Sequence, residues 1–228
     1  KKNNKPVLSV YHTHFISYMK YYFKYAPFLV KTAELLVKKM YQSFYNRCDV
    51  VYVPSVRIMK ELEEYGVSKN VMKLWQRGIN SHLFNPSNRD IRFIRRLTGN
   101  DNPCILFVSR LVWEKNVETL FGICDEMESR GMEVNFIIAG NGVAEESARQ
   151  RMKNAIFLGF LNQDDLATVY ASSDVFVFTS ISETYGNVVV EAMSSGCVPV
   201  IANGGVSQAL VKNGVTGFLC EPDNPVDY

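Results

Sequence analysis

The chain has 228 residues, of which 47% are hydrophobic and 21% are charged, and its formal net charge is +2. This is the composition of an ordinary globular protein, and so small a net charge argues against nucleic acid as a partner. No stretch has the roughly eighteen consecutive apolar residues of a membrane-spanning helix. Five scattered cysteines without a Cys-x-x-Cys pair argue against zinc and disulfide frameworks. We expect buried, reduced thiols in a cytoplasmic protein.

Short apolar runs alternate with amphipathic ones along the chain. The apolar runs predict strands at 7–11, 49–53, 72–75, 104–109, 134–139, 155–158, 174–179, 197–201 and 217–220. Helical patterns lie near 27–46, 56–65, 90–98, 116–129, 144–152, 163–172, 187–195 and 206–212. Several strands, such as Val175-Phe176-Val177-Phe178, are apolar throughout, which is typical of a parallel sheet buried on both faces. Strands and helices alternating in this way predict a doubly wound α/β fold.

A polar seam at 84–102 separates two pieces of the chain. It has a proline near each end, clustered Asn and Asp residues and one short basic helix pattern, so we interpret it as an interdomain linker. The piece from Pro103 onward contains a nearly complete series of strands and helices. Residues 1–83 have too few strands to close a sheet by themselves. Together with a start at Lys1 and no initiator Met, this predicts a chain that is truncated at its front.

The most informative segment runs from Thr179 to Met193, where a buried strand leads into a helix. In open α/β sheets, ligands bind beyond the carboxyl ends of the strands, and a helix that begins near Gly186 directs free N–H groups toward a phosphate there. Glu183 and Glu191 flank that position. Carboxylates repel phosphate but accept hydrogen bonds from hydroxyl groups, so the pair suits the sugar and the ribose of a nucleotide sugar. Alternatively, Glu191 is a solvated helix residue and Glu183 a helix cap.

Two cations follow the first strand of the second piece. Arg110 leaves the end of that strand, and Lys115 lies at the start of the next helix. At this edge of the sheet both would balance the charge of a diphosphate, particularly as charge grows on a leaving group. The alternative is a surface arginine and a pair between Lys115 and Glu114. The pair of glutamates and the pair of cations are both predicted at the same end of one sheet, which favours the functional interpretation of each pair.

Three shorter motifs carry less information. Gly140-Asn141-Gly142 matches part of a dinucleotide fingerprint, but Glu145 occupies the third glycine position, so a tight turn is favoured over a nicotinamide site. The backbone of Gly159-Phe160-Leu161 could meet the edge of a nucleobase, or could form only a turn. His12 and His14 share a face if the first strand continues, which favours a functional role. A metal pair there would lack a third ligand, so we expect no metal.

Taken together, these motifs resemble the retaining glycosyltransferases of family 4. The ordered set covers about 103–221 and adds the segments 192–200, 204–205 and 214–218 to the motifs described above. The front piece is similar to the end of the family's N-terminal domain, through the segments 11–15, 53–55 and 77–86. The similarity is greatest to lipid-directed members such as sulfoquinovosyl- and glucosyl-diacylglycerol synthases. In one departure, Ser207-Gln208 stands where the family usually has Pro-Glu after the late Gly-Gly pair.

The resemblance implies a GT-B architecture, in which two Rossmann-like domains face each other across a cleft. Residues 1–83 would then be the end of the acceptor-side domain, and residues 103–228 a nucleotide-sugar-binding domain without its last helices. Arg110 and Lys115 would hold the diphosphate, Glu183 the donor sugar and Glu191 the ribose, with His14 approaching the sugar from the other domain. The remaining donor-binding positions implied are Gly142, Phe160, Leu161, Thr184, Tyr185, Gly186, Asn187 and Val188.

The resemblance also implies metal-independent transfer of a sugar, with retention, from a nucleotide diphosphate to a sugar or lipid acceptor, and no cofactor besides this donor. A UDP-sugar epimerase of similar shape and a non-catalytic nucleotide-sugar-binding module are the alternatives.

Residues 18–47 bear on location, because they hold six cations against the single acid Glu34. Aromatic residues lie between the cations, and such a stretch suits the surface of an anionic membrane. We therefore expect peripheral contact with the inner face of a membrane. The alternative is a core helix with a solvated basic face. The six cations are Lys20, Lys24, Lys31, Lys38, Lys39 and Arg47.

Overall fold

The computed structural model describes residues 5–13, 15–19, 23, 26–75 and 78–228. The chain divides into two compact units. Unit 1 comprises Lys1–Gly78 with the segment Ser182–Tyr185, and unit 2 comprises Ile79–Ile181 and Gly186–Tyr228. His14, Lys20 and Lys24, which were singled out from the sequence, lie outside the described residues. The domain limits expected at 83 and 103 stay a prediction.

Unit 1 contains a three-stranded parallel sheet in its described part, with the strand order β1-β2-β3. Its strands are β1 (Leu8–Val10), β2 (Val50–Val53) and β3 (Met72–Leu74), and its helices are α2 (Val30–Tyr45) and α3 (Val56–Glu64). Short 3-10 turns cover Phe15–Tyr18, Pro27–Leu29 and Lys69–Val71. Helix α3 begins after Ser55, whose hydroxyl accepts a hydrogen bond from the Ile58 amide at 3.2 Å. This is an N-cap, and it explains where the helix starts.

Unit 2 contains a six-stranded, wholly parallel sheet in the order β6-β5-β4-β7-β8-β9. The strands are β4 (Cys104–Val108), β5 (Asn135–Ala139), β6 (Ile156–Gly159), β7 (Val175–Phe178), β8 (Val198–Ala202) and β9 (Phe218–Cys220). The helices are α4 (Ile91–Thr98), α5 (Val117–Ser129), α6 (Glu145–Arg151), α7 (Gln163–Ser172) and α8 (Asn187–Ser194). The chain order reverses between β4 and β7. This is the doubly wound fold expected from the sequence, with its topological switch point between those two strands.

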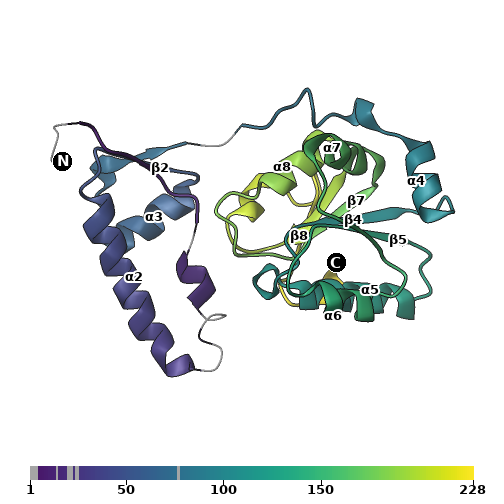
Figure 1. Cartoon of the computed structure of the whole chain (residues 1–228), viewed down its shortest axis with the longest axis horizontal. Helices are drawn as coiled ribbons and strands as arrows, with labels where there is room; N and C mark the ends of the chain where they lie inside the picture. Colours follow the sequence, from purple (N-terminus) through teal and green to yellow (C-terminus); the bar gives the residue numbers. More distant parts are fainter. Residues whose placement is uncertain (1–4, 14, 20–22, 24–25, 76–77) are drawn as a thin grey trace. The chain divides into compact units, whose positions relative to one another are not determined.

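Helices cover both faces of the unit 2 sheet. In Figure 1, α7 and α8 lie on one face, and α5 and α6 lie on the other. Every residue of β4 is buried, so the switch-point strand contributes side chains to both core layers. One layer contains Leu106, Tyr170 and Phe176, and the other contains Phe107 and Leu120. A strand packed on both faces has no room for a polar side chain, which explains its continuous apolar run.

Two expectations about local structure need correction. The segment 206–212 was expected to form a helix, but the structure has a single 3-10 turn over Ser207–Leu210. The backbone is already extended at Val211, with φ −113° and ψ 129°, so the turn ends after Leu210 and does not continue as a helix. The first strand ends at Val10, so strand alternation does not extend to His12. Its ring Nδ1 lies 3.2 Å from the Val10 carbonyl oxygen.

Candidate functional site

The carboxyl ends of β4 and β7 are joined by hydrogen bonds between the segments that follow them. The Thr179 hydroxyl donates to the Lys115 carbonyl oxygen at 3.0 Å. The Asn116 side-chain amide donates to the Thr179 carbonyl oxygen at 3.5 Å. The segment with the predicted cations and the segment that leads toward α8 are therefore tied together at the switch point. Thr179 is fully buried, so these bonds are shielded from water.

Asn116 is a residue that the sequence reasoning missed. It adopts a left-handed conformation with φ +55° at the end of the 3-10 turn Trp113–Lys115. Asparagine tolerates this conformation better than most residues. Its amide also donates to Asp223 Oδ1 at 2.7 Å, which connects the switch point to the end of the chain. The sequence signal that could have identified this residue is an Asn between a short polar turn and an apolar helical pattern.

The two predicted cations differ in their surroundings. The Arg110 side chain is 64% exposed and forms an ion pair with Glu114 at 3.7 Å. Lys115 is only 6% exposed, at the end of a 3-10 turn and not at the start of a helix. Glu114 thus pairs with Arg110, and the pair between Lys115 and Glu114 that the alternative interpretation expected stays a prediction. At this distance, and with most of the Arg110 side chain in solvent, the pair is weak.

Helix α8 begins after Gly186, and the local geometry requires glycine there. Gly186 has φ +94°, and a Cβ atom added to it would lie 2.6 Å from Ser207 Oγ. Any other residue would be strained by its backbone and blocked by Ser207. The first amides of α8, at Asn187 and Val188, have no intrahelical acceptor. The positive end of the helix dipole therefore lies beside the β7 end of the sheet, where an anion is favoured.

Glu191 lies on α8 and is partly buried. Its Oε2 atom lies 3.3 Å from the hydroxyl of Tyr170 on α7. Burial raises the pKa of the Glu191 carboxyl, and the hydrogen bond from Tyr170 acts in the opposite direction. Burial also raises the pKa of Tyr170 well above its usual value, so this hydroxyl is the donor. The carboxylate is thus held by the core rather than fully solvated.

A cavity of about 400 Å³ opens at the ends of β4, β5 and β6. Its lining is largely apolar and includes three of the predicted donor-site residues, namely Arg110, Phe160 and Leu161. Phe160 is 84% exposed, so its ring is accessible to a ligand at the edge of this cavity. A flat apolar ring that continues into a charged group would fit beside Arg110. The other lining residues are Val108, Ser109, Ala139, Gly140, Asn141 and Leu166.

Gly142 has a packing reason to be glycine. A Cβ atom at this position would collide with the carbonyl oxygen of Leu111. The same carbonyl accepts a hydrogen bond from the Ala144 amide at 2.9 Å, and the Leu111 amide donates to the Asn141 carbonyl oxygen at 2.9 Å. The Gly-Asn-Gly turn therefore packs directly against the Arg110 segment. The role of Gly142 in donor binding stays a prediction.

The remaining predicted residues are not placed with those of unit 2. Glu183, Thr184 and Tyr185 lie in the segment that groups with unit 1, and His14 is not among the described residues. Within the described ranges, no group of three or more His, Cys, Asp or Glu residues could hold a metal ion. None of the described helices is long and apolar enough to cross a membrane. All five cysteines are buried as free thiols.

Comparisons with known proteins place this geometry in context. The family described as "Glycosyl transferases group 1" matches residues 88–228, and "Glycosyltransferase Family 4" matches residues 1–83. The chain is 35% identical to the sulfoquinovosyl transferase SQD2 of Arabidopsis thaliana, over 97% of this chain and 43% of that protein. It is 27% identical to the alpha-monoglucosyldiacylglycerol synthase of Streptococcus pneumoniae, over 87% of this chain and 46% of that protein.

Among solved structures, HepE of Anabaena in complex with UDP and glucose matches with a TM-score of 0.77. The match covers 98% of this chain and 60% of HepE, at 23% identity, and therefore concerns the fold. The chain spans about half the length of the curated relatives that it matches.

Proposed function

The chain belongs to the group 1, family 4 glycosyltransferases, and from this premise we propose that it transfers a sugar from a nucleotide diphosphate donor to an acceptor hydroxyl. One observation carries the proposal. In unit 2, β4 and β7 form the switch point. Arg110 and Lys115 follow β4, α8 begins after β7, and an apolar cavity opens beside Arg110. This combination suits a ligand with a base, a ribose and a diphosphate. The fold is GT-B, as in the structural neighbours.

The proposed mechanism assigns a task to each part of the site. The base enters the cavity against the Phe160 and Leu161 backbone, and Glu191 accepts hydrogen bonds from the ribose hydroxyls. The diphosphate lies at the start of α8, with its N–H groups and the two cations around it. Negative charge grows on the diphosphate as the bond to the sugar breaks. Donors that are already in place then stabilise the transition state more than the bound donor.

The remaining roles rest on the family resemblance. Glu183 would bind hydroxyls of the donor sugar, the backbone from Thr184 to Val188 would contact phosphate, and His14 would approach the sugar. Retention at the anomeric carbon is proposed on the same ground. Residues 1–83 would belong to the acceptor-side domain, 84–102 to a linker, and 103–228 to the donor-binding domain. The chemistry proposed here has no step that requires a metal or a further cofactor.

Product release distinguishes this proposal from its rivals. The complete polypeptide is incubated with a panel of nucleotide sugars, with and without acceptor, and free nucleoside diphosphate is measured. A transferase releases it in step with glycosylated acceptor. An epimerase would change the sugar of the donor without acceptor, and a binding module would be stabilised by donor without releasing product. A donor present at 100 times its Kd should stabilise the folded state by about 2.7 kcal/mol, so a thermal-shift panel first identifies the donor.

For the acceptor, we propose a lipid at an anionic membrane surface. Leu36, Met40 and Phe44 lie at successive turns of α2, with exposures of 63%, 55% and 55%. Residues four apart share one face of a helix, so these side chains form an exposed apolar stripe. Lys39, which lies next to this stripe in sequence, is exposed. An amphipathic helix with apolar and basic side chains suits the boundary between headgroups and acyl chains.

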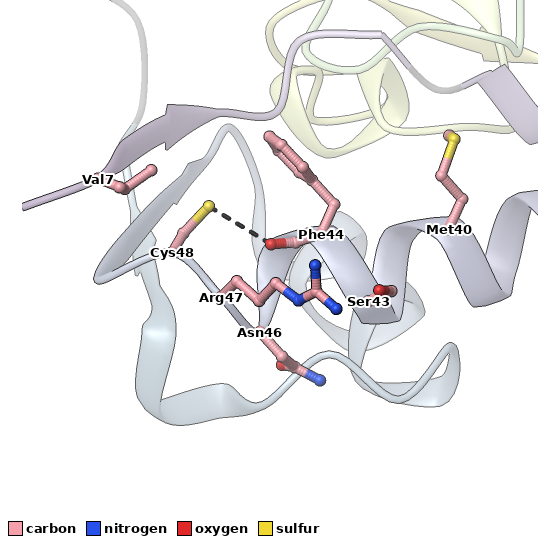
Figure 2. A pocket seen from close by; sticks show the side chains of 7 residues that line it. All are labelled: Val7, Met40, Ser43, Phe44, Asn46, Arg47 and Cys48. Carbon is pink, nitrogen blue, oxygen red and sulfur yellow. Dashed lines mark hydrogen bonds between the residues drawn. The ribbon is translucent and has the colours of Figure 1, made fainter. Parts of the chain in front are cut away.

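A cavity of about 730 Å³ lies at the end of this stripe. Figure 2 shows Met40 and Phe44 from α2 together with Arg47 and Cys48, and the Cys48 thiol donates to the Phe44 carbonyl oxygen at 3.7 Å. The apolar part of this hollow suits the acyl chains of a lipid acceptor, and Arg47 beside it suits the anionic headgroups of the surrounding membrane. The name of the Streptococcus pneumoniae relative states a diacylglycerol product, which supports the same class of acceptor.

A further inference from the structure

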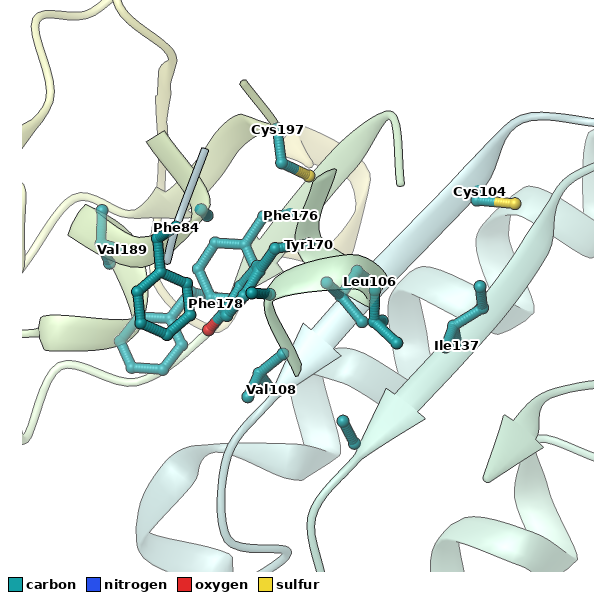
Figure 3. Packing of buried hydrophobic residues seen from close by; sticks show 14 of the residues in the cluster. Phe84, Cys104, Leu106, Val108, Ile137, Tyr170, Phe176, Phe178, Val189 and Cys197 are labelled. Carbon is teal, nitrogen blue, oxygen red and sulfur yellow. The ribbon is translucent and has the colours of Figure 1, made fainter. Parts of the chain in front are cut away.

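Tyr170 is a buried tyrosine whose hydroxyl points at the site instead of at another core residue. Its side chain is fully buried. The ring packs edge-on against Phe84 and Phe176, with centroid distances of 6.0 and 5.7 Å. Figure 3 shows Tyr170 close to Phe84, Phe176 and Phe178 in this buried cluster. Ring packing on two sides leaves Tyr170 little freedom to move, so the position of its hydroxyl is set by the core.

The hydroxyl has one hydrogen-bond partner in the described part of the chain, Glu191 Oε2 at 3.3 Å. The contact joins α7 to α8, two helices that pack together on one face of the sheet. Over the same residues, no protein donor contacts the other oxygen, Oε1. A carboxylate can accept several hydrogen bonds, so holding Oε2 leaves Oε1 available to a ligand.

We propose that Tyr170 is a positioning residue, which holds the Glu191 carboxylate through Oε2 so that Oε1 accepts hydrogen bonds from the donor's ribose. This inference rests on the proposed function, because Glu191 meets ribose only if the donor is a nucleotide sugar. A glutamate side chain has several rotatable bonds, and restricting them before the ligand arrives lowers the entropy cost of binding. The same hydrogen bond favours the ionised carboxylate at a position where burial disfavours it.

The test is Tyr170→Phe in the complete polypeptide, since phenylalanine keeps the ring and its packing. We expect the donor KM to rise roughly tenfold, which is about 1.4 kcal/mol. The turnover at saturating donor should change less than twofold, because ribose is bound equally in the ground and transition states. An unchanged KM would overturn the inference. The Kd of the nucleoside diphosphate product, measured by calorimetry, should rise by the same factor and provides a readout without catalysis.

A double-mutant cycle separates positioning from general support of the fold. In a Glu191→Ala background, Tyr170→Phe should have no further effect on donor binding, because the carboxylate that it positions is gone. An equal loss in both backgrounds would assign Tyr170 a purely structural role. A 2′-deoxyribose nucleotide should show the same pattern. It should bind more weakly than the ribose form to the wild type, and Tyr170→Phe should narrow that difference.

Tyr228→Phe is the matched control. The Tyr228 hydroxyl is also buried, has no hydrogen-bond partner among the described residues, and packs against the opposite core layer. Its removal should leave donor KM unchanged, and a tenfold rise there would contradict the local explanation. Absence of acceptor-dependent product release in the wild type would instead refute the proposed function itself. The two failures are therefore distinguishable.

Discussion

Gly186→Ala tests whether the residue before α8 must be glycine, because of both its left-handed backbone and the close approach of Ser207. Gly186 has φ +94°, and the added Cβ atom would lie 2.6 Å from Ser207 Oγ and 3.1 Å from Ser207 Cβ. The left-handed conformation costs a residue with a side chain about 1–2 kcal/mol. Forcing an extra methyl into a packed site costs a further 1–3 kcal/mol or so. We therefore expect a total loss of about 2–5 kcal/mol.

Gly131→Ala is the matched control for backbone strain. Gly131 has φ +64°, and an added Cβ atom would meet nothing within 4 Å. This variant should lose only about 1–2 kcal/mol from the conformational term. The difference between the two variants then measures the collision with Ser207.

Thermal unfolding of the complete polypeptide measures these losses. For chains of this size, 1 kcal/mol shifts Tm by roughly 2–4 °C, so Gly186→Ala should lower Tm by at least about 4 °C. In a Ser207→Gly background, the loss should shrink to the value of Gly131→Ala, because only the left-handed backbone remains. Equal losses for Gly186→Ala and Gly131→Ala, or no recovery with Ser207→Gly, would refute the reasoning.

Three further predictions concern binding, turnover and location. Glu191→Ala should raise the donor KM roughly 10- to 100-fold, which is the scale of a hydrogen bond to a charged group. The turnover should be nearly unchanged, and a large fall in kcat at saturating donor would contradict the ribose assignment. Arg110→Ala should reduce turnover by about 10²–10³-fold, which is the scale of losing one oxyanion donor, while Glu114→Gln should keep the wild-type turnover. Wild-type turnover in Arg110→Ala would refute the proposal that Arg110 stabilises the leaving diphosphate. Sedimentation with vesicles should show binding to anionic but not neutral lipid, and weaker binding at 1 M salt, where the Debye length is about 3 Å. Equal pelleting with both lipids would exclude an electrostatic membrane contact. Binding should be lost when four described cations are changed to Gln, namely Lys31, Lys38, Lys39 and Arg47.

The expected strands agree with the observed strands to within one residue at each end. The sequence determines this much because a parallel strand buried on both faces must be apolar throughout and must stop where polar turns begin. The segments that carry the candidate site could be located in the same way, since each directly follows such a strand. The start of α8 after Gly186 was also predictable, because a glycine before an apolar helical pattern is a local signal.

Contacts between distant segments were decided only by the tertiary structure. The strand order that makes β4 and β7 neighbours brings Thr179 to the Lys115 carbonyl, although 64 residues separate them. Similarly, Ser207 blocks a side chain at Gly186, and Tyr170 reaches Glu191. Sequence patterns indicate which positions are buried and with what period the buried positions recur along the chain. They do not report which residues of two different elements meet, because that depends on how helices pack on the faces of the sheet.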